Sequence, residues 1–350
     1  MSGRVGPRLG PADVGRRVVL RRRAGGGRFA DVLGDLLAWD VTAGTARVRT
    51  RAGEVVVALA DVVAGTVVPP PPTRRGAPHR VIGWQDLQDV AADGWRPVEL
   101  DWLGTPGRSW RLRAAEGFTG RANSVLAIGD PDDVGTSIAD AVDRAEAWYS
   151  ARGLPARFAI PWPLDATRLP DGARDGDLDR ELRARGYLLD TPTLVLTAAL
   201  RDVAASLARE PVDGLDLSLT ERPDDDWLGV YRYRGQDLPP VAPQLLMSAP
   251  AQAFVQVRDA GRTVAVGRAA SSRGWTGLSA VEVLPAYRRR GLARRVVAAA
   301  VEWGLERGDR SGYLQVAEAN AAARGLYEAT GWSPHSGYHY RIHRGPVRRR

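Results

Sequence analysis

The chain has 350 residues, 44% of them hydrophobic and 26% charged, as expected for a globular protein with a substantial core. Its length predicts two or three structural units. The absence of cysteine excludes disulfides, thiolate catalysis and cysteine-based metal sites. No apolar run approaches the roughly 20 residues that a membrane span needs, and the N-terminus lacks a hydrophobic signal core. We therefore expect a cytoplasmic protein without membrane contact.

Positive charge is concentrated at the two ends of the chain. The formal net charge is +8, and all 49 basic residues are arginine. Residues 1–30 hold eight arginines and one aspartate, and residues 341–350, which include a basic tail at 345–350, hold five arginines and no acid. The body between them is net acidic, so we expect any nucleic-acid contact to be made by the tails.

Residues 10–68 are expected to form a small β-barrel. Short β-branched or alternating segments are separated there by glycine-rich turns, at Val18–Leu20, Ala30–Gly34, Thr45–Thr50 and Glu54–Leu59. This close spacing favours a small barrel, and the segment resembles an SH3-like barrel. Such a barrel could bind peptide or nucleic acid, or could be a passive appendage. Four prolines then open a stiff linker, which we place at 69–79.

Residues 80–205 carry α/β patterning. The apolar spacing predicts a helix at Ile138–Ser150, a strand at 156–160, a second helix at 178–184 and another strand at 193–200. The pair Gly186-Tyr187 marks the end of the second helix. No arginine-rich loop precedes the first helix, where Gly129–Asp133 is acidic instead.

Residues 212–344 repeat this order of helix, strand, helix, glycine-aromatic pair and strand. Asp224 is a predicted cap for a helix that reaches Tyr233, because acidic residues favour a helix start. Alternating segments predict an antiparallel meander of strands at 254–258, 263–269 and 278–283. The next helix carries one apolar stripe and ends at Gly308; the stripe consists of Leu292, Val296, Ala299 or Ala300, and Trp303.

An arginine-glycine loop opens this last helix. The strand ending at Val283 is followed by a break at Pro285 and then by Arg288–Arg294, with Gly291 in the middle. The first N–H groups of a helix have no intrahelical partner and carry the positive end of its dipole, so they favour an anion. Taken alone, this loop is more typical of a solvated helix cap than of a pyrophosphate site.

The residues after that helix favour the second interpretation. A strand-like segment at Tyr313–Ala317 precedes Asn320, Leu326-Tyr327 and Gly331-Trp332. Together with Arg288-x-x-Gly291-x-Ala293, these residues resemble the two signature motifs of the GNAT acyltransferase superfamily. The resemblance implies an α/β (α+β) fold, with a mixed sheet flanked by helices. SH3-like barrels precede GNAT regions in certain actinobacterial proteins.

The repeated element order implies a tandem arrangement. Aligning Gly186-Tyr187 with Gly331-Trp332 makes Leu182 the counterpart of Tyr327, and Asp175 that of Asn320. Because the first half lacks the arginine-glycine loop, we interpret 80–205 as a degenerate GNAT-like half and 212–344 as the catalytic domain. The prediction is one acetyl-CoA site per chain.

The resemblance assigns roles to individual residues. Main-chain groups of the strand would pair with the pantetheine arm, loop amides would hold the pyrophosphate, and Asn320 would contact the pantetheine region; Asn320 could equally cap the next helix. Tyr327 matches the general acid beside the sulfur, with a core aromatic as its alternative role. The predicted acetyl-CoA-binding residues are Val281, Glu282, Val283, Arg288, Arg289, Arg290, Gly291, Leu292, Ala293, Arg294, Asn320 and Tyr327.

The general base is less defined. Enzymes similar to the ribosomal-protein alanine acetyltransferases carry a glutamate where this chain has Gln315, and an amide cannot accept the proton of an amine. Glu282, on the cofactor strand, is the candidate base, and Glu318 is a weaker one. A water-linked base would also serve, since many members of the superfamily use one.

These residues predict an N-acetyltransferase that moves an acetyl group directly from acetyl-CoA to the primary amine of a small molecule or protein. Two alternatives are a non-catalytic acyl-CoA sensor and a nucleic-acid-associated regulatory protein. No metal is expected, because the histidines at His335, His339 and His343 lie in a segment that reads as strand or loop. The sequence does not predict the acceptor or the oligomeric state.

Overall fold

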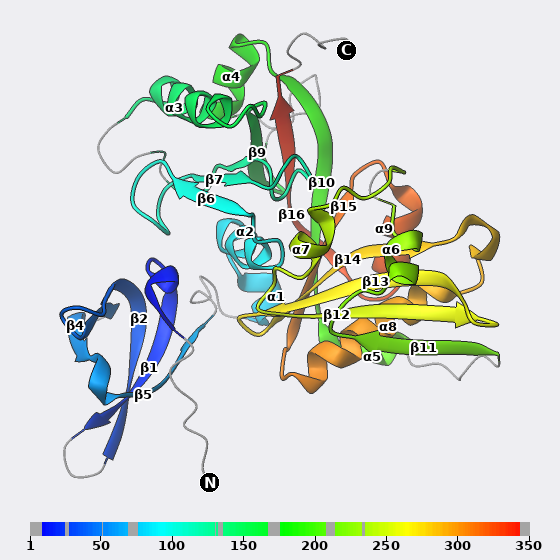
Figure 1. Ribbon diagram of the computed structural model, residues 1–350, viewed down its shortest axis with the longest axis horizontal. Coiled ribbons are helices and arrows are strands. Elements are labelled where there is room, and N and C mark those ends of the chain that lie inside the picture. The colour runs from blue at the N-terminus through cyan, green and yellow to red at the C-terminus, as the bar shows by residue number, and fades with distance from the viewer. Residues whose placement is uncertain are drawn as a thin grey trace. The chain divides into compact units, whose positions relative to one another are not determined.

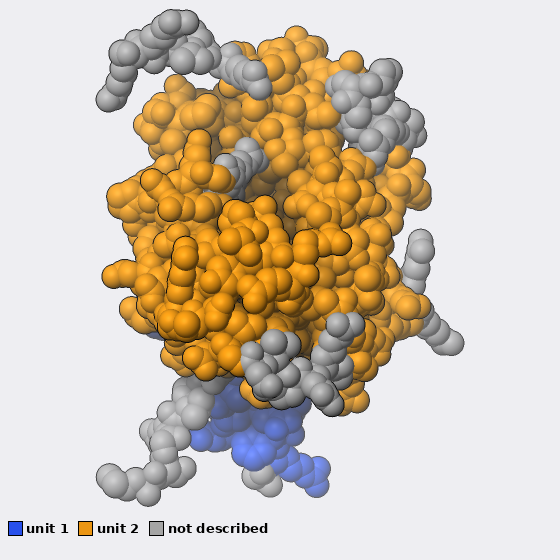
Figure 2. Space-filling view, turned by 90° about the vertical axis from the view of Figure 1, so that its right-hand side faces the viewer, with its two compact units in different colours: residues 1–71, 104–109 blue, residues 72–103, 110–350 orange. Residues whose placement is uncertain are grey.

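The computed structural model describes residues 9–24, 28–50, 52–68, 76–129, 131, 136–166, 176–207, 214–232 and 235–343. It divides into two compact units, one made of residues 1–71 and 104–109 and the other of 72–103 and 110–350 (Figures 1 and 2). Asp175, most of the linker, most of Gly129–Asp133 and the tail at 345–350 lie outside the described residues. No helix in the described ranges is long and apolar enough to cross a membrane.

The first unit contains a five-stranded antiparallel sheet in the order β4-β3-β2-β1-β5. Its elements are η1 (Pro11–Asp13), β1 (Arg17–Ala24), β2 (Arg28–Asp40), β3 (Thr45–Thr50), β4 (Gly53–Ala58), η2 (Leu59–Asp61) and β5 (Val62–Val67). Alternate residues such as Val18, Leu20 and Leu36 form its core. The sequence predicted the first four strands and missed β5. The resemblance to an SH3-like barrel stays a prediction.

The second unit contains a mixed sheet of eleven strands. The strands are β6 (Glu99–Trp102), β7 (Arg111–Ala114), β8 (Val125–Leu126), β9 (Arg157–Pro163), β10 (Leu188–Ala199), β11 (Leu215–Thr220), β12 (Ala251–Asp259), β13 (Arg262–Ser272), β14 (Trp275–Val283), β15 (Ser311–Ala317) and β16 (Ser333–Ile342). The helices are α1 (Pro78–Val81), α2 (Trp84–Asp93), α3 (Ile138–Ser150), α4 (Asp177–Ala184), α5 (Leu200–Leu207), α6 (Asp225–Val230), α7 (Ala242–Leu246), η3 (Pro285–Tyr287), α8 (Leu292–Glu306) and α9 (Ala321–Glu328).

The two halves of this sheet have the same plan and exchange one strand. The strand order is β11-β12-β13-β14-β15-β10-β16-β9-β8-β7-β6. In each half a parallel strand pair is joined through a helix, α3 between β8 and β9 and α8 between β14 and β15. Strand β10 lies between β15 and β16, whereas β16 lies between β10 and β9 (Figure 1). The segments 80–205 and 212–344 therefore share one sheet.

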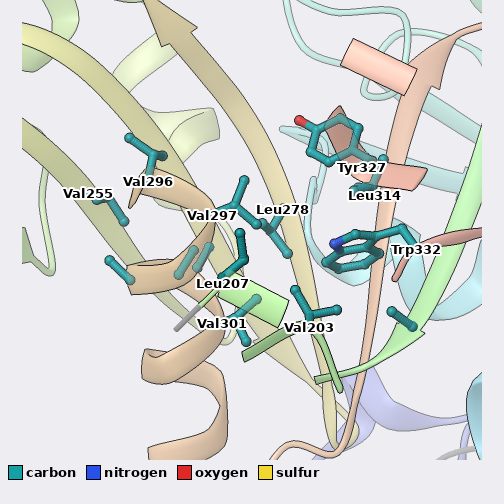
Figure 3. Packing of buried hydrophobic residues seen from close by; sticks show 14 of the residues in the cluster. Val203, Leu207, Val255, Leu278, Val296, Val297, Val301, Leu314, Tyr327 and Trp332 are labelled. Carbon is teal, nitrogen blue, oxygen red and sulfur yellow. The ribbon is translucent and has the colours of Figure 1, made fainter. Parts of the chain in front are cut away.

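Helices cover both faces of the β11–β15 part of this sheet. Val255 and Val257 of β12 pack with α8 and α5, while Phe254, which precedes Val255, packs with α6 and α7 on the other face. Figure 3 shows side chains of α8 meeting those of α5 and β14. Helix α8 lies very close to β13 at Gly267. A Cβ at this position would stand 2.3 Å from Cγ1 of Val296, so the close approach requires glycine.

The predicted helices are confirmed, with one shorter than expected. Helix α3 has the predicted bounds, and α4 begins one residue early. Asp224 caps α6 as predicted, accepting a hydrogen bond from the N–H of Trp227 at 2.7 Å. Helix α6 ends at Val230 instead of reaching Tyr233, because Tyr231 adopts an extended conformation.

A buried ion cluster joins α4 to β16. Asp179 accepts hydrogen bonds from Nε of Arg341 at 2.9 Å and from Nη2 at 2.7 Å, and Nε2 of His339 lies 2.7 Å from its Oδ1. All three side chains are 1–2% exposed. Burial would raise the pKa of Asp179, but the hydrogen bonds from His339 and Arg341 hold it below its ordinary value. His339 therefore has a structural role. The histidine-containing segment, which the sequence predicted to be strand or loop, forms strand β16.

Candidate functional site

Strands β14 and β15 separate near the middle of the large sheet. They pair in parallel from Trp275 and Ser311 to Leu278 and Leu314, and no further pairs follow in the described residues. Beyond this point β14 continues to Val283 while pairing on its other side with β13. The separation leaves an opening between the two strands, on the side where α8 begins.

A β-bulge deforms β14 at the same place. Arg268 pairs with Ser279 and Val266 with Glu282, so β14 has one residue more than β13 in this interval. Ala280 lies within the bulge and has a positive φ of 53°. Leu278 and Val281 both pack with the α8 cluster, whereas Ala280 packs on the opposite face. The bulge thereby changes the face of the sheet on which the side chains of the last strand residues lie.

Gly291 begins α8 in the left-handed conformation, with φ 79° and ψ 0°. An ideal Cβ at Gly291 would meet no atom within 4 Å, so glycine is required there for its dihedral angles rather than for space. No side chain caps the helix, and its first turn holds no acidic residue. The 15-residue helix therefore presents its N–H groups and positive dipole end to whatever lies before it.

A cleft of about 810 Å³ lies at this helix start. It brings together eleven of the residues that the sequence singled out, namely Val281, Glu282, Val283, Arg288, Arg289, Gly291, Leu292, Ala293, Arg294, Asn320 and Tyr327. Arg290 does not line the cleft; its guanidinium lies over the ring of Tyr287, 5.2 Å from the centroid. The cleft also has walls that were not among the predicted binding residues, at Tyr287, Ala321–Ala323, Gly325 and Leu326, of which the sequence motif had named only Leu326. Small residues along α9 give no chemical signal in a sequence, although they let the helix approach a ligand.

Tyr327 lies between the core and the cleft. Its side chain is 8% exposed, and its ring meets that of Trp332 edge-on, with 6.4 Å between centroids. In Figure 3 the hydroxyl lies at the end of the ring that points away from Leu314 and Trp332. Burial raises the pKa of Tyr327 to about 12, so the hydroxyl keeps its proton at neutral pH. Its two proposed roles, core aromatic and proton donor, are compatible in this geometry.

Asn320 caps α9. Its side-chain oxygen accepts a hydrogen bond from the N–H of Ala323 at 3.1 Å, and the residue also lines the cleft. The capping role that sequence analysis offered as an alternative is therefore present in the structure. It also fixes the start of the helix that carries Tyr327.

The candidate bases occupy different surroundings. Glu282 lines the cleft and lies 3.7 Å from Arg288. Burial raises the pKa of Glu282, and the charge of Arg288 opposes this rise. Glu318 does not line the cleft. Gln315 on β15 accepts hydrogen bonds from Arg121 and, at 3.4 Å, from the hydroxyl of Tyr338.

The described part of the chain holds no group of three or more His, Cys, Asp or Glu side chains placed to bind a metal ion. His335 instead places Nε2 2.9 Å from the carbonyl oxygen of Ile82, and the ring of His343 lies against that of Tyr187.

A family model described as "Probable histone acetyltransferase Rv0428c C-terminal" matches residues 84–341. The "Uncharacterized N-acetyltransferase YobR" of Bacillus subtilis (strain 168) is 28% identical over 272 residues, which are 74% of this chain and 98% of that protein.

Two solved structures are similar in fold. A GCN5-related N-acetyltransferase from Kribbella flavida has a TM-score of 0.53 at 16% identity, covering 75% of this chain and 96% of that one. A tandem GNAT protein from the clavulanic acid biosynthesis pathway has a TM-score of 0.52 at 13% identity, covering 78% and 91%.

Proposed function

The chain belongs to the family described as probable histone acetyltransferase Rv0428c C-terminal and is an N-acetyltransferase of the GNAT type; from this premise we propose that it moves an acetyl group directly from acetyl-CoA to a primary amine. Its fold is a mixed α/β, GNAT-like fold, with a large mixed sheet flanked by helices. The observation that carries the proposal is the 810 Å³ cleft, which combines an uncapped helix start with a protonated tyrosine.

The walls of the cleft suit acetyl-CoA. The N–H groups that follow Gly291 would bind the pyrophosphate, and Arg288 and Arg289 add positive charge beside them. Val281 and Val283 line the cleft beyond the point where β14 and β15 separate, and an extended pantetheine arm could pair with their main-chain groups there. These assignments extend the resemblance in the sequence to residues that share one cavity.

Acetyl-CoA would supply an activated acetyl group as a thioester. The amine nitrogen attacks the carbonyl carbon, the new C–N bond forms, and the C–S bond breaks. Tyr327 holds the proton that the departing thiolate takes from its Oη, and the proton lost by the amine returns to the phenolate through solvent or a base. Glu282 is the candidate base because it is the carboxylate that lines the cleft and because burial raises its pKa, which makes the ionised carboxylate a stronger proton acceptor than an exposed glutamate.

We further propose that the β6–β9 half is a degenerate GNAT half. Its plan repeats that of the other half around the β10 and β16 pair, and the similar tandem GNAT protein supports this arrangement. The five-stranded unit is proposed to be an SH3-like barrel; its strand number supports this assignment.

Release of CoA from acetyl-CoA tests the function. Because the chain has no cysteine, a thiol reagent measures free CoA without background from the protein. A panel of peptides, polyamines and aminoglycosides should include amines that accelerate release, with an acetylated product detected by mass spectrometry. Tight binding of acetyl-CoA without release for any amine would contradict the proposal and favour an acyl-CoA sensor.

A further inference from the structure

A cavity of about 10 Å³ lies in the large sheet at the point where β14 and β15 separate. Its lining includes Leu278, the last residue of β14 that pairs with β15, and Ser279, which follows it. Tyr313 of β15 and Ala270 of β13 form two of its other walls. The cavity is separate from the proposed acetyl-CoA cleft, because the described residues that line the two are different.

The cavity and the cleft are nevertheless neighbours along β14. Ser279 lines the cavity and Val281 lines the cleft, with only the bulged residue Ala280 between them. Leu278, a wall of the cavity, belongs to the same core cluster as Tyr327, the proposed proton donor to the thiolate. A thioester whose sulfur lies beside Tyr327 would therefore hold its acyl group close to the cavity.

Tyr313 is a fixed wall of this cavity, because its ring lies between two glycines. An ideal Cβ at Gly277 of β14 would overlap Cζ and Oη of this ring, and one at Gly94, which ends α2, would lie 2.7 Å from Oη. The side chain of Tyr313 is 6% exposed. The ring is thus in direct contact with backbone on two sides and cannot shift toward either.

Arg268 is a second fixed wall. It donates hydrogen bonds from Nε to the carbonyl oxygen of Leu246 at 2.6 Å and from Nη2 to that of Gly94 at 2.9 Å. Its guanidinium carbon lies 4.8 Å from the ring centroid of Trp95, which also lines the cavity. Arg268 is 1% exposed and Trp95 is 5% exposed. Both side chains are therefore held in place by their neighbours.

The volume of the cavity limits what it can hold. A space of about 10 Å³ is close to the minimum for one water molecule. The terminal methyl of an acetyl group is of similar size, whereas an ethyl or propyl group requires a wall to move. Because Tyr313 and Arg268 are fixed, each added methylene would overpack the site.

We propose that this cavity receives the methyl group of the donor and that Tyr313 sets its depth, so that the enzyme uses acetyl-CoA and excludes propionyl-CoA and longer acyl-CoAs. The inference rests on the proposed acetyl transfer and adds the selectivity for the acyl group. The methyl group would contact the ring of Tyr313, the side chain of Ala270 and the backbone of Gly277, which are apolar or carry no side chain. Tyr313 is thus a specificity-determining residue.

The first test compares acyl donors of increasing length. CoA release is measured with acetyl-, propionyl-, butyryl- and hexanoyl-CoA, each with the amine that gives the fastest release from acetyl-CoA. We expect kcat/KM for acetyl-CoA to exceed that for propionyl-CoA by about 10- to 200-fold, the range for one methylene in a hydrophobic pocket. The longer donors should be slower still. Similar values for acetyl- and butyryl-CoA would overturn the inference.

A variant of Tyr313 tests the depth of the cavity. Tyr313→Leu removes the ring above Gly277 and should raise the ratio of kcat/KM for propionyl-CoA to that for acetyl-CoA by about tenfold or more. The matched control is Phe254→Leu, which shortens another buried aromatic side chain of the same sheet. Phe254 is not among the described residues that line the cavity, so this variant should keep the wild-type ratio. Equal ratios in both variants would overturn the role of Tyr313.

A variant of Ser279 tests the cavity in the opposite direction. Ser279 is half-buried, and its hydroxyl lies 3.4 Å from Nη1 of Arg268. Ser279→Val places methyl groups in the cavity and should lower kcat/KM for acetyl-CoA about tenfold or more, while CoA, which has no acyl group, binds as before. Ser279→Ala loses the same hydroxyl without filling the cavity and should retain activity. Wild-type kcat/KM in Ser279→Val would overturn the methyl site, even if Tyr313→Leu does not fold.

Failure of the inference differs from failure of the proposed function. Equal use of all four donors would overturn the limit on the acyl group and leave acyl transfer intact. If no donor releases CoA with any amine, calorimetric titration of the wild type with acetyl-CoA and butyryl-CoA tests the cavity directly. An affinity about tenfold or more lower for butyryl-CoA, with the difference reduced in Tyr313→Leu, would support the inference even then. Equal affinities would overturn it.

Discussion

The N–H of Trp332 donates a hydrogen bond to the carbonyl oxygen of Tyr327 at 3.1 Å, which closes the turn after α9. The other half of the sheet makes the same bond from Tyr187 to Leu182, at 2.9 Å. In both turns a glycine with positive φ precedes the donor. The two turns that the sequence aligned therefore have the same backbone geometry. In the first half the apolar residue Leu182 stands where Tyr327, the proposed general acid, stands in the second.

This correspondence predicts one donor site per chain. Leu182 is fully buried in the α3 and α4 cluster, and it has no hydroxyl to offer a thiolate. We expect calorimetric titration to give one acetyl-CoA bound per chain. A stoichiometry of two would contradict the interpretation of the first half as degenerate.

Gly291→Glu should abolish acetyl-CoA binding. A side chain at φ 79° adds strain of about 1 kcal/mol, and a carboxylate there would repel the pyrophosphate. Gly308→Glu is the matched control, since Gly308 also has positive φ and open space but does not line the cleft. Both variants should be destabilised similarly in urea unfolding, and only Gly291→Glu should lose affinity. Equal affinities in titration would contradict the loop assignment.

Tyr327→Phe should lower turnover far more than acetyl-CoA affinity. Removal of a general acid typically costs 10²- to 10⁴-fold in rate, roughly, while the phenyl ring preserves the packing against Trp332. Tyr287→Phe removes the other hydroxyl-bearing ring of the same cleft and should have little effect on turnover. Steady-state rates of both variants at saturating substrate test this difference. Wild-type turnover of Tyr327→Phe would leave the residue as a core aromatic alone.

Glu282 should control the acidic side of the pH profile. A base acts while deprotonated, so activity should be present above its pKa and fall as the pH drops through it. The pKa of an ordinary glutamate is near 4.5, and burial raises the pKa of Glu282. The fall in activity should therefore occur at a higher pH than an ordinary glutamate would give. Glu282→Gln should lower kcat/KM and remove the fall. An unchanged profile in the variant would assign the proton to solvent or another group.

Asp179→Asn should destabilise the second unit strongly. It leaves Arg341 buried without its anion, a change that typically costs about 3–5 kcal/mol. Because the pKa of Asp179 is lowered in the folded state, its contribution is complete above the ordinary pKa near 3.8 and is lost as the pH falls below that value. Urea unfolding at pH 7 and near pH 3 should show the difference from wild type shrinking with acid.

The matched control for this change is Asp177→Asn on the same helix. Asp177 is 79% exposed in its pair with Arg180, so its loss should cost less than about 1 kcal/mol. If the two variants lose equal stability, the buried cluster contributes nothing beyond a surface pair.

Much of the catalytic half could be predicted from the sequence because its signals are local. The apolar stripe of α8, the cap at Asn320 and the loop around Gly291 each depend on residues a few positions apart. The bulge at Ala280 and the separation of β14 from β15 could not be predicted, since both arise from pairing between distant strands.

The exchange of β10 and β16 also sets an order for synthesis. A chain leaving the ribosome completes β9 and β10 long before β16, which must lie between them. Until the last described strand emerges, the middle of the eleven-stranded sheet lacks one of its members, and edges that are later buried stay open to other partners. The innermost part of this sheet is therefore the last to be made, and a ribosome that stops early releases two unfinished halves instead of one finished domain.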